Sequence, residues 1–132
     1  MKTVSRALPV ATAALACFST LACAADTSAY PDRPIRMLVG FAPGGGTDTT
    51  ARALAGKMSE RLGQQVIIDN RPGAAGNIAT DIAAPAQPDG YTILMGTIAA
   101  LAINPALYAK LPFDPLKDVV PITRAVDSTN IL

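Results

Sequence analysis

Two glycine-rich segments hold the residues best suited to bind a small anion. The first covers residues 42–48 and contains three consecutive glycines, and the second covers residues 73–77 and reads Gly-Ala-Ala-Gly-Asn. Each lies between a predicted strand and a predicted helix, where backbone N–H groups at the start of the helix attract a carboxylate or a phosphate. Glycines also serve simply to make a tight turn, so the composition of either loop alone leaves both interpretations open.

The residues that nucleotide-binding loops require are missing beside the first segment. A P-loop carries Lys followed by Ser or Thr after its last glycine, but Asp48-Thr49 is found here. The dinucleotide pattern would place a glycine at Thr49. The carboxylate of Asp48 would also repel a phosphate, whereas it suits a ligand that brings a cation, a hydroxyl or a water. A site for a small anion is therefore the main interpretation, and an exported nucleotide- or phosphate-binding α/β enzyme is the alternative.

Other catalytic chemistry is restricted by which residue types the sequence lacks. It contains no histidine, and both cysteines, Cys17 and Cys23, lie near the amino terminus. Triads that use histidine, Cys–His pairs and metal sites built from His or Cys are therefore excluded from residues 25–132. The Asp, Glu, Lys, Ser and Tyr residues form no recognisable catalytic motif. We expect no catalytic residue, no metal, no cofactor and no enzymatic activity.

Predicted strands and helices alternate along the chain. Apolar runs predict strands at residues 35–41, 66–68 and 91–95, with a further strand at 119–122. Helical spacing of apolar residues predicts helices at residues 47–62, 77–84 and 104–110. Thr47 and Asp48 are good N-cap residues for the first of these helices, and Gly63 supplies its stop.

This alternation indicates an α/β fold with a mostly parallel, doubly wound sheet. Ligands of such sheets bind at the carboxyl ends of the strands. Both glycine loops and the turn at Gly96-Thr97 lie at that edge, which favours the binding interpretation over simple turns. Arg71 could clamp a carboxylate, but a lone arginine beside a Pro-Gly turn is more typical of a solvated loop.

Residues 1–24 are typical of a secretory signal peptide. Lys2 and Arg6 precede an apolar run over residues 8–21, which is shorter than the roughly 20 residues of a membrane-spanning helix. Ala22-Cys23-Ala24 fits a cleavage site. We therefore predict cleavage after Ala24 and a periplasmic protein. A lipoprotein acylated at Cys23 is the alternative, although Thr20 stands where such signals usually carry Leu.

Charge and length limit the functions of the mature chain. Lys2 and Arg6 lie in the signal peptide, so its removal changes the formal net charge from +1 to −1. No basic patch suited to nucleic acid remains. Residues 25–132 suffice for one small domain, and they end on an apolar run that suggests a chain cut within an element.

The mature chain resembles the Bug family, the periplasmic receptors associated with tripartite tricarboxylate transporters. The resemblance covers nearly all of residues 25–132 and follows the family motifs in order. The matching segments are Pro31-Asp32-Arg33-Pro34-Ile35, Phe41-Ala42-Pro43-Gly44-Gly45-Gly46-Thr47-Asp48 with Ala51-Arg52, Asn70-Arg71-Pro72-Gly73-Ala74-Ala75-Gly76-Asn77, Pro88-Asp89-Gly90-Tyr91-Thr92, Asn104-Pro105, Leu107-Tyr108, Leu111-Pro112-Phe113-Asp114-Pro115 and Lys117-Asp118.

The resemblance implies a two-lobed binding protein of type II, of which residues 25–132 are the first lobe, incomplete, with the second lobe largely absent. It implies a small organic acid as ligand, transporter subunits of the tripartite tricarboxylate type as membrane partners, and a monomer. We expect residues 25–132 alone to bind organic acids weakly and to be poorly soluble. The candidate ligand-binding residues are Phe41, Pro43, Gly44, Gly45, Gly46, Thr47, Asp48, Gly73, Ala74, Ala75, Gly76, Asn77 and Thr97.

Overall fold

The structure is a computed structural model that describes residues 30–127. The predicted signal peptide and both cysteines lie outside these residues. No helix in the described part of the chain is long and apolar enough to cross a membrane.

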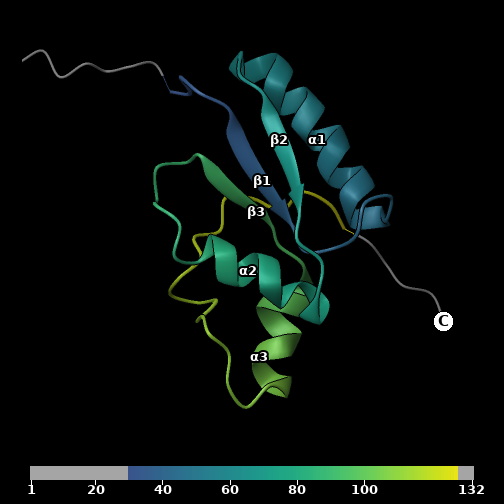
Figure 1. The fold of residues 1–132 in the computed structure, drawn as a ribbon, viewed down its shortest axis with the longest axis vertical. Helices are drawn as coiled ribbons and strands as arrows, with labels where there is room; N and C mark the ends of the chain where they lie inside the picture. Colours follow the sequence, from purple (N-terminus) through teal and green to yellow (C-terminus); the bar gives the residue numbers. More distant parts are fainter. Residues whose placement is uncertain (1–29, 128–132) are drawn as a thin grey trace, which may run out of the picture.

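Three parallel strands form the sheet: β1 (Ile35–Val39), β2 (Val66–Asn70) and β3 (Thr92–Met95). Their order is β2-β1-β3, so β1 is central (Figure 1). Val39 at the end of β1 pairs with Asn70 and with Met95, the last residues of the two neighbours. All three strands therefore end at one level, and the loops that follow them leave the sheet at the same edge.

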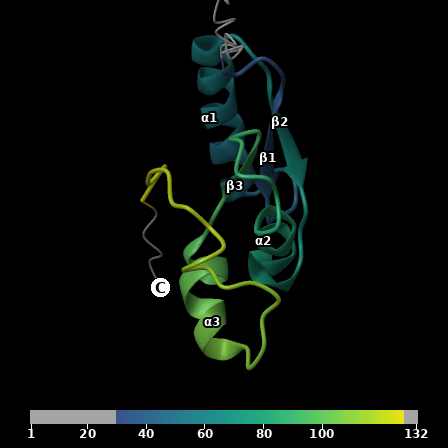
Figure 2. The same cartoon turned by 90° about the vertical axis from the view of Figure 1, so that its left-hand side faces the viewer.

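Helices cover both faces of this sheet. On one face, α1 (Gly46–Leu62) places Ala51 against Met37 and Val39, and these three residues form the centre of the core. Figure 2 shows α1 alongside the strands. Side chains alternate along a strand, so the fully buried Leu38 points to the opposite face. There α2 (Asn77–Ala83) contacts β1 and β3. This arrangement confirms the predicted doubly wound α/β fold.

The first helix begins earlier than predicted. Gly45, with φ −77° and ψ 168°, is the N-cap of α1, and no side chain caps it. The prediction that Thr47 and Asp48 are N-caps is wrong, because both lie inside the first turn and Asp48 reaches back to bind the N–H of Gly44. The predicted stop is confirmed, since Gly63 is left-handed at φ 69° and bonds to the carbonyl of Ser59.

The last part of the described chain differs most from the prediction. A π-helical segment, η2 (Ala99–Ile103), runs into α3 (Asn104–Leu107), so the helix expected at residues 104–110 begins earlier and ends sooner. Figure 1 shows α3 beyond the carboxyl ends of β1 and β2. The strand predicted at residues 119–122 is wrong: those residues are irregular, and Val120 and Ile122 are exposed. A strand needs a neighbour for its backbone groups, and none pairs with this segment within residues 30–127.

Candidate functional site

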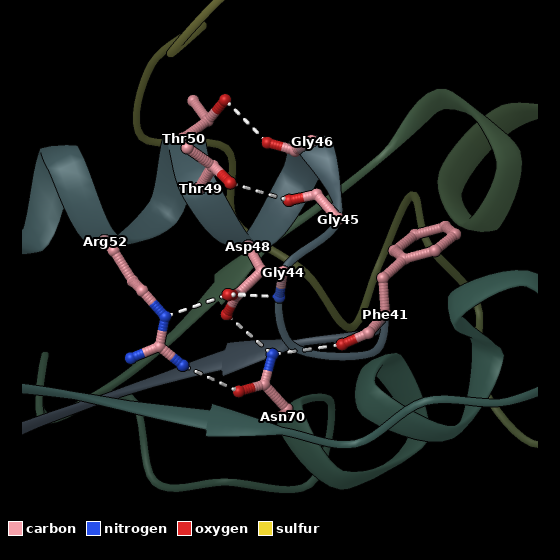
Figure 3. Close-up of polar contacts among 9 residues, drawn as sticks. All are labelled: Phe41, Gly44, Gly45, Gly46, Asp48, Thr49, Thr50, Arg52 and Asn70. Atoms are coloured by element: carbon pink, nitrogen blue, oxygen red, sulfur yellow. Dashed lines mark hydrogen bonds and ion pairs between the residues drawn. The ribbon is translucent and has the colours of Figure 1, made fainter.

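The first loop is organised around the carboxylate of Asp48 (Figure 3). Oδ2 of Asp48 accepts hydrogen bonds from the backbone N–H of Gly44 at 2.9 Å and from Nε of Arg52 at 2.8 Å. Oδ1 accepts a third hydrogen bond from Nδ2 of Asn70 at 2.9 Å. The residue is only 2% exposed, so this carboxylate is a fixed internal part of the loop.

The same contacts control the charge of Asp48. The hydrogen bond from Arg52, followed by those from the N–H of Gly44 and from Asn70, holds the pKa of this carboxyl well below its usual range. The ionised carboxylate is balanced by the guanidinium of Arg52, which is one helical turn away. The repulsion of an anion that the sequence suggested is therefore offset within the loop.

Asp48 is one of the predicted ligand-binding residues, but its side chain is turned into the protein. Both carboxylate oxygens already accept hydrogen bonds from the chain. What the geometry shows is a role in shaping the loop. A direct contact between Asp48 and a ligand stays a prediction.

Asn70, at the end of β2, ties the first loop to the neighbouring strand. Its Nδ2 donates to the carbonyl of Phe41 at 3.0 Å as well as to Asp48, and its Oδ1 accepts from Arg52 at 3.2 Å. The sequence interpretation missed Asn70 and Arg52 as parts of this site. The spacing of Asp48 and Arg52, four residues apart on a helix, was the signal that could have revealed the ion pair.

The second loop has an unusual backbone. Four consecutive residues have positive φ angles: Gly73 at 136°, Ala74 at 46°, Ala75 at 55° and Gly76 at 96°. The left-handed conformation costs a residue other than glycine roughly 1–2 kcal/mol, and two alanines adopt it here. Such a conformation persists only where the surrounding structure imposes it, and it is concentrated at functional sites.

The three loops meet at Gly76. A Cβ added to Gly40 would lie 2.7 Å from the Cα of Gly76. A Cβ added to Gly76 would lie 3.2 Å from the Cβ of Ala100 and 3.7 Å from both Cε2 of Phe41 and Oγ1 of Thr97. The structure thus brings together Phe41, Gly76 and Thr97, which follow three different strands.

Thr97 has an unsatisfied hydroxyl at this junction. Its Oγ1 is buried and has no hydrogen-bond partner among residues 30–127. Leaving a buried polar group unpaired costs roughly 1–3 kcal/mol. The predicted residue Thr97 therefore combines a position between the loops with an unused hydrogen-bonding group.

A cavity of about 1050 Å³ opens beside the junction. Its polar part is formed by the start of α1, at Gly46, Thr47 and Thr50, and by Gly96 and Thr97 after β3. Its apolar part lies between α1 and β3, farther from the loops. Residues 122–127 line the cavity on a further side. Of the predicted ligand-binding residues, Gly46, Thr47 and Thr97 line this cavity. Phe41, Pro43, Gly44, Gly45, Asp48 and residues 73–77 do not.

Residues 30–127 contain no group of three or more Asp, Glu, His or Cys side chains that could hold a metal ion. The lining of the cavity at the loop edge includes the hydroxyl-bearing residues Thr47 and Thr97.

The fold is similar to those of solved periplasmic binding proteins. The solved structure of the periplasmic binding protein BugD is 43% identical, with a TM-score of 0.62 over 67% of this chain and 29% of BugD. MatC from Rhodopseudomonas palustris, solved with bound malate, is 40% identical with a TM-score of 0.64 over 67% of this chain and 30% of MatC. The described fold is thus part of a periplasmic binding protein fold.

The family follows from sequence. The family model described as "Tripartite tricarboxylate transporter family receptor" matches residues 50–132. Protein BugT of Bordetella pertussis is 45% identical over 109 residues, which is 82% of this chain and 33% of BugT. The chain belongs to this receptor family, and the predicted resemblance is confirmed. It spans about a third of the length of the curated relatives that it matches.

Proposed function

We propose that this protein is a non-enzymatic, periplasmic receptor for a small organic carboxylate. The ligand carboxylate binds at the edge where the loops after β1, β2 and β3 meet. One observation carries the proposal: Ala74 and Ala75 in the second loop are both left-handed and both exposed, and they lie beside the first loop. The N–H of Gly76 bonds to the carbonyl of Gly73, so Ala74 and Ala75 are the central residues of a turn. Successive backbone N–H groups in a turn form concave sites that attract anions.

The first loop supplies donors of the same kind. The N–H of Thr49 bonds to the carbonyl of Gly45, so the N–H groups of Gly46 and Thr47 precede the first bond within the helix and remain available. The 17-residue helix α1 adds the positive end of its dipole at this point. The ion pair of Asp48 with Arg52 leaves little net charge to oppose an anion there.

The ligand class is supported by chemistry and by the family. The proposed donors are backbone N–H groups and the hydroxyls of Thr47 and Thr97, which suit a carboxylate and do not require a metal or a cofactor. MatC, which shares this fold, was solved with malate bound. We propose that the present protein also binds a small organic acid, acts as a monomer and delivers its ligand to a tripartite tricarboxylate-type transporter. Because its relatives are much longer, we propose that residues 25–132 provide one side of the site.

An NMR titration of the complete gene product tests the location of the site. Malate and a panel of other mono-, di- and tricarboxylates are added to protein labelled with ¹⁵N, with ATP and NAD as comparison ligands. We expect an organic acid to shift the amide signals of residues 44–47, 73–77 and 97 first. Saturable binding of a nucleotide at these amides, without binding of any organic acid, would overturn the proposal in favour of the nucleotide alternative.

A further inference from the structure

Asn104, at the start of α3, reaches back into the second loop. It is only 3% exposed, although asparagine is a polar residue. Its Nδ2 donates to Oδ1 of Asn77 at 2.7 Å and to the carbonyl of Ala74 at 3.4 Å. The residues that it joins are 27 and 30 positions earlier in the sequence. A single buried amide therefore links the segment after β3 to the loop after β2.

The contact with Ala74 constrains a neighbouring N–H group. The carbonyl of Ala74 and the N–H of Ala75 belong to one planar peptide unit, and in a trans peptide they point in opposite directions. The carbonyl of Ala74 faces Asn104, which donates a hydrogen bond to it, and it also accepts a hydrogen bond from the N–H of Asn77. The N–H of Ala75 is therefore directed to the outer side, where Ala75 is exposed.

The contact with Asn77 likewise fixes the orientation of the side-chain amide of Asn77. Oδ1 of Asn77 accepts the hydrogen bond from Asn104, so the Nδ2 of Asn77 faces a different direction. The amide of Asn104 thus fixes which end of Asn77 is turned inward. Both consequences leave hydrogen-bond donors, rather than acceptors, pointing away from Asn104.

The path of η2 explains how Asn104 arrives at this place. The N–H of Asn104 bonds to the carbonyl of Ala99 five residues earlier, as in a π-helix, which changes the direction in which the following side chain projects. Ala100, four residues before Asn104, is 2% exposed and packs over Gly76. Residues four apart lie on one face of a helix. That face, formed by Ala100 and Asn104, supports the second loop from behind.

We infer that Asn104 is a positioning residue that turns the N–H of Ala75 and the Nδ2 of Asn77 toward the bound carboxylate. The inference rests on the proposed function for its ligand, but the orientation of the loop can be measured in the free protein. Asn104 was not among the ligand-binding residues predicted from the sequence.

The free protein tests the orientation. In the complete gene product labelled with ¹³C and ¹⁵N, Asn104→Ala should shift the carbonyl carbon of Ala74, the amide of Ala75 and the side-chain amide of Asn77. Phe113→Leu, at a buried residue outside the proposed site, controls for lost stability. If these three signals keep their wild-type positions in Asn104→Ala, the inference is overturned, whatever ligand the protein binds.

The affinity for an organic acid tests whether the two donors that Asn104 positions contribute to binding. Calorimetry with the tightest acid of the panel should show Asn104→Ala at least tenfold weaker than wild type. Asn104→Asp should be weaker still, because a carboxylate cannot donate and would draw the Nδ2 of Asn77 inward. Phe113→Leu should bind as wild type does. Equal affinity of wild type and Asn104→Asp would overturn the inference and leave the proposed function intact, whereas a wild type that binds no acid contradicts the proposed function.

Discussion

Gly40 lies so close to the backbone of Gly76 that it has no room for a side chain. A Cβ on Gly40 would lie 2.7 Å from the Cα of Gly76. This contact joins the end of the central strand to the loop that follows its neighbour. It places the two glycine loops side by side and so defines the proposed site.

Replacing Gly40 should therefore disturb the fold as well as the loops. Gly40 is buried, and the atom that its Cβ would meet belongs to the backbone, which cannot move aside cheaply. We expect Gly40→Ala to lower the free energy of unfolding by about 1–3 kcal/mol, measured by urea denaturation. Gly56→Ala, in an open helical position, should instead raise it by up to about 1 kcal/mol. A Gly40→Ala protein as stable as wild type would show that the contact between the loops is loose.

Gly45 offers a way to block the proposed site while the fold stays intact. Its φ is −77°, and an added Cβ would meet only the carbonyl oxygen of Ala42, at 3.5 Å. Valine at this position should therefore be accommodated, although it is a poorer N-cap than glycine. Because its methyl groups would cover the nearby N–H groups, Gly45→Val should bind the organic acid at least tenfold more weakly, which is about 1.4 kcal/mol.

Calorimetry on Gly45→Val measures this, and circular dichroism checks that the variant is folded. Gly56→Ala is the matched control, since it also adds a side chain to α1 but lies away from the loops. Unchanged affinity in a folded Gly45→Val protein would mean that the first loop is only a turn.

The stability of the protein should depend on pH through Asp48. Its pKa is lowered in the folded state by Arg52, Gly44 and Asn70. The carboxylate therefore stabilises the fold fully above the pKa of the unfolded chain, near pH 4, and this contribution is lost as the pH falls toward the lower folded-state value. Asp48→Asn should be less stable than wild type at pH 7, and the difference should shrink steadily below about pH 4.

Urea denaturation of wild type and Asp48→Asn at several pH values measures that difference. Subtraction removes the effect of other carboxylates with lowered pKa values, such as Asp69 and Asp114. A difference in stability that is the same at pH 7 and pH 3 would contradict the role assigned to the ionised carboxylate.

The predicted signal peptide gives an independent prediction about the amino terminus of the mature protein. Ala22-Cys23-Ala24 predicts cleavage after Ala24, so the mature chain should begin at Ala25 and carry no lipid. The intact mass of the protein purified from whole cells, membranes included, decides between this and the lipoprotein alternative. A chain that begins at Cys23 with the added mass of a diacylglycerol would contradict the prediction.

Local patterns were sufficient to predict the βα units that carry the proposed site. The apolar run after Pro34 and the stop at Gly63 depend on residues close together in sequence, and both match the structure. The inward role of Asp48 could not be predicted in this way, because its partner Asn70 is 22 residues away and becomes adjacent only when β1 and β2 pair.

Dependence on residues distant in the sequence also explains why the strand at residues 119–122 was wrongly predicted and why Asn104 was missed. Whether Val119 and Val120 form a strand depends on a neighbouring strand that the local sequence does not specify. The contact of Asn104 with Asn77 depends on the π-helical path of η2, and the apolar sequence of residues 99–103 gives no sign of it. The contacts of Asp48 with Asn70 and of Asn104 with Asn77, both between units distant in the sequence, were missed.

We expect the complete gene product to bind a small organic carboxylate without converting it. Isothermal titration calorimetry with malate and the panel of mono-, di- and tricarboxylates tests this directly, and chromatography of the recovered ligand shows whether it has changed. We predict one acid that binds with a Kd of about 1 µM or lower, corresponding to about −8.2 kcal/mol, and is recovered intact. The absence of saturable heat with every acid, or recovery of a chemically altered ligand, would contradict it.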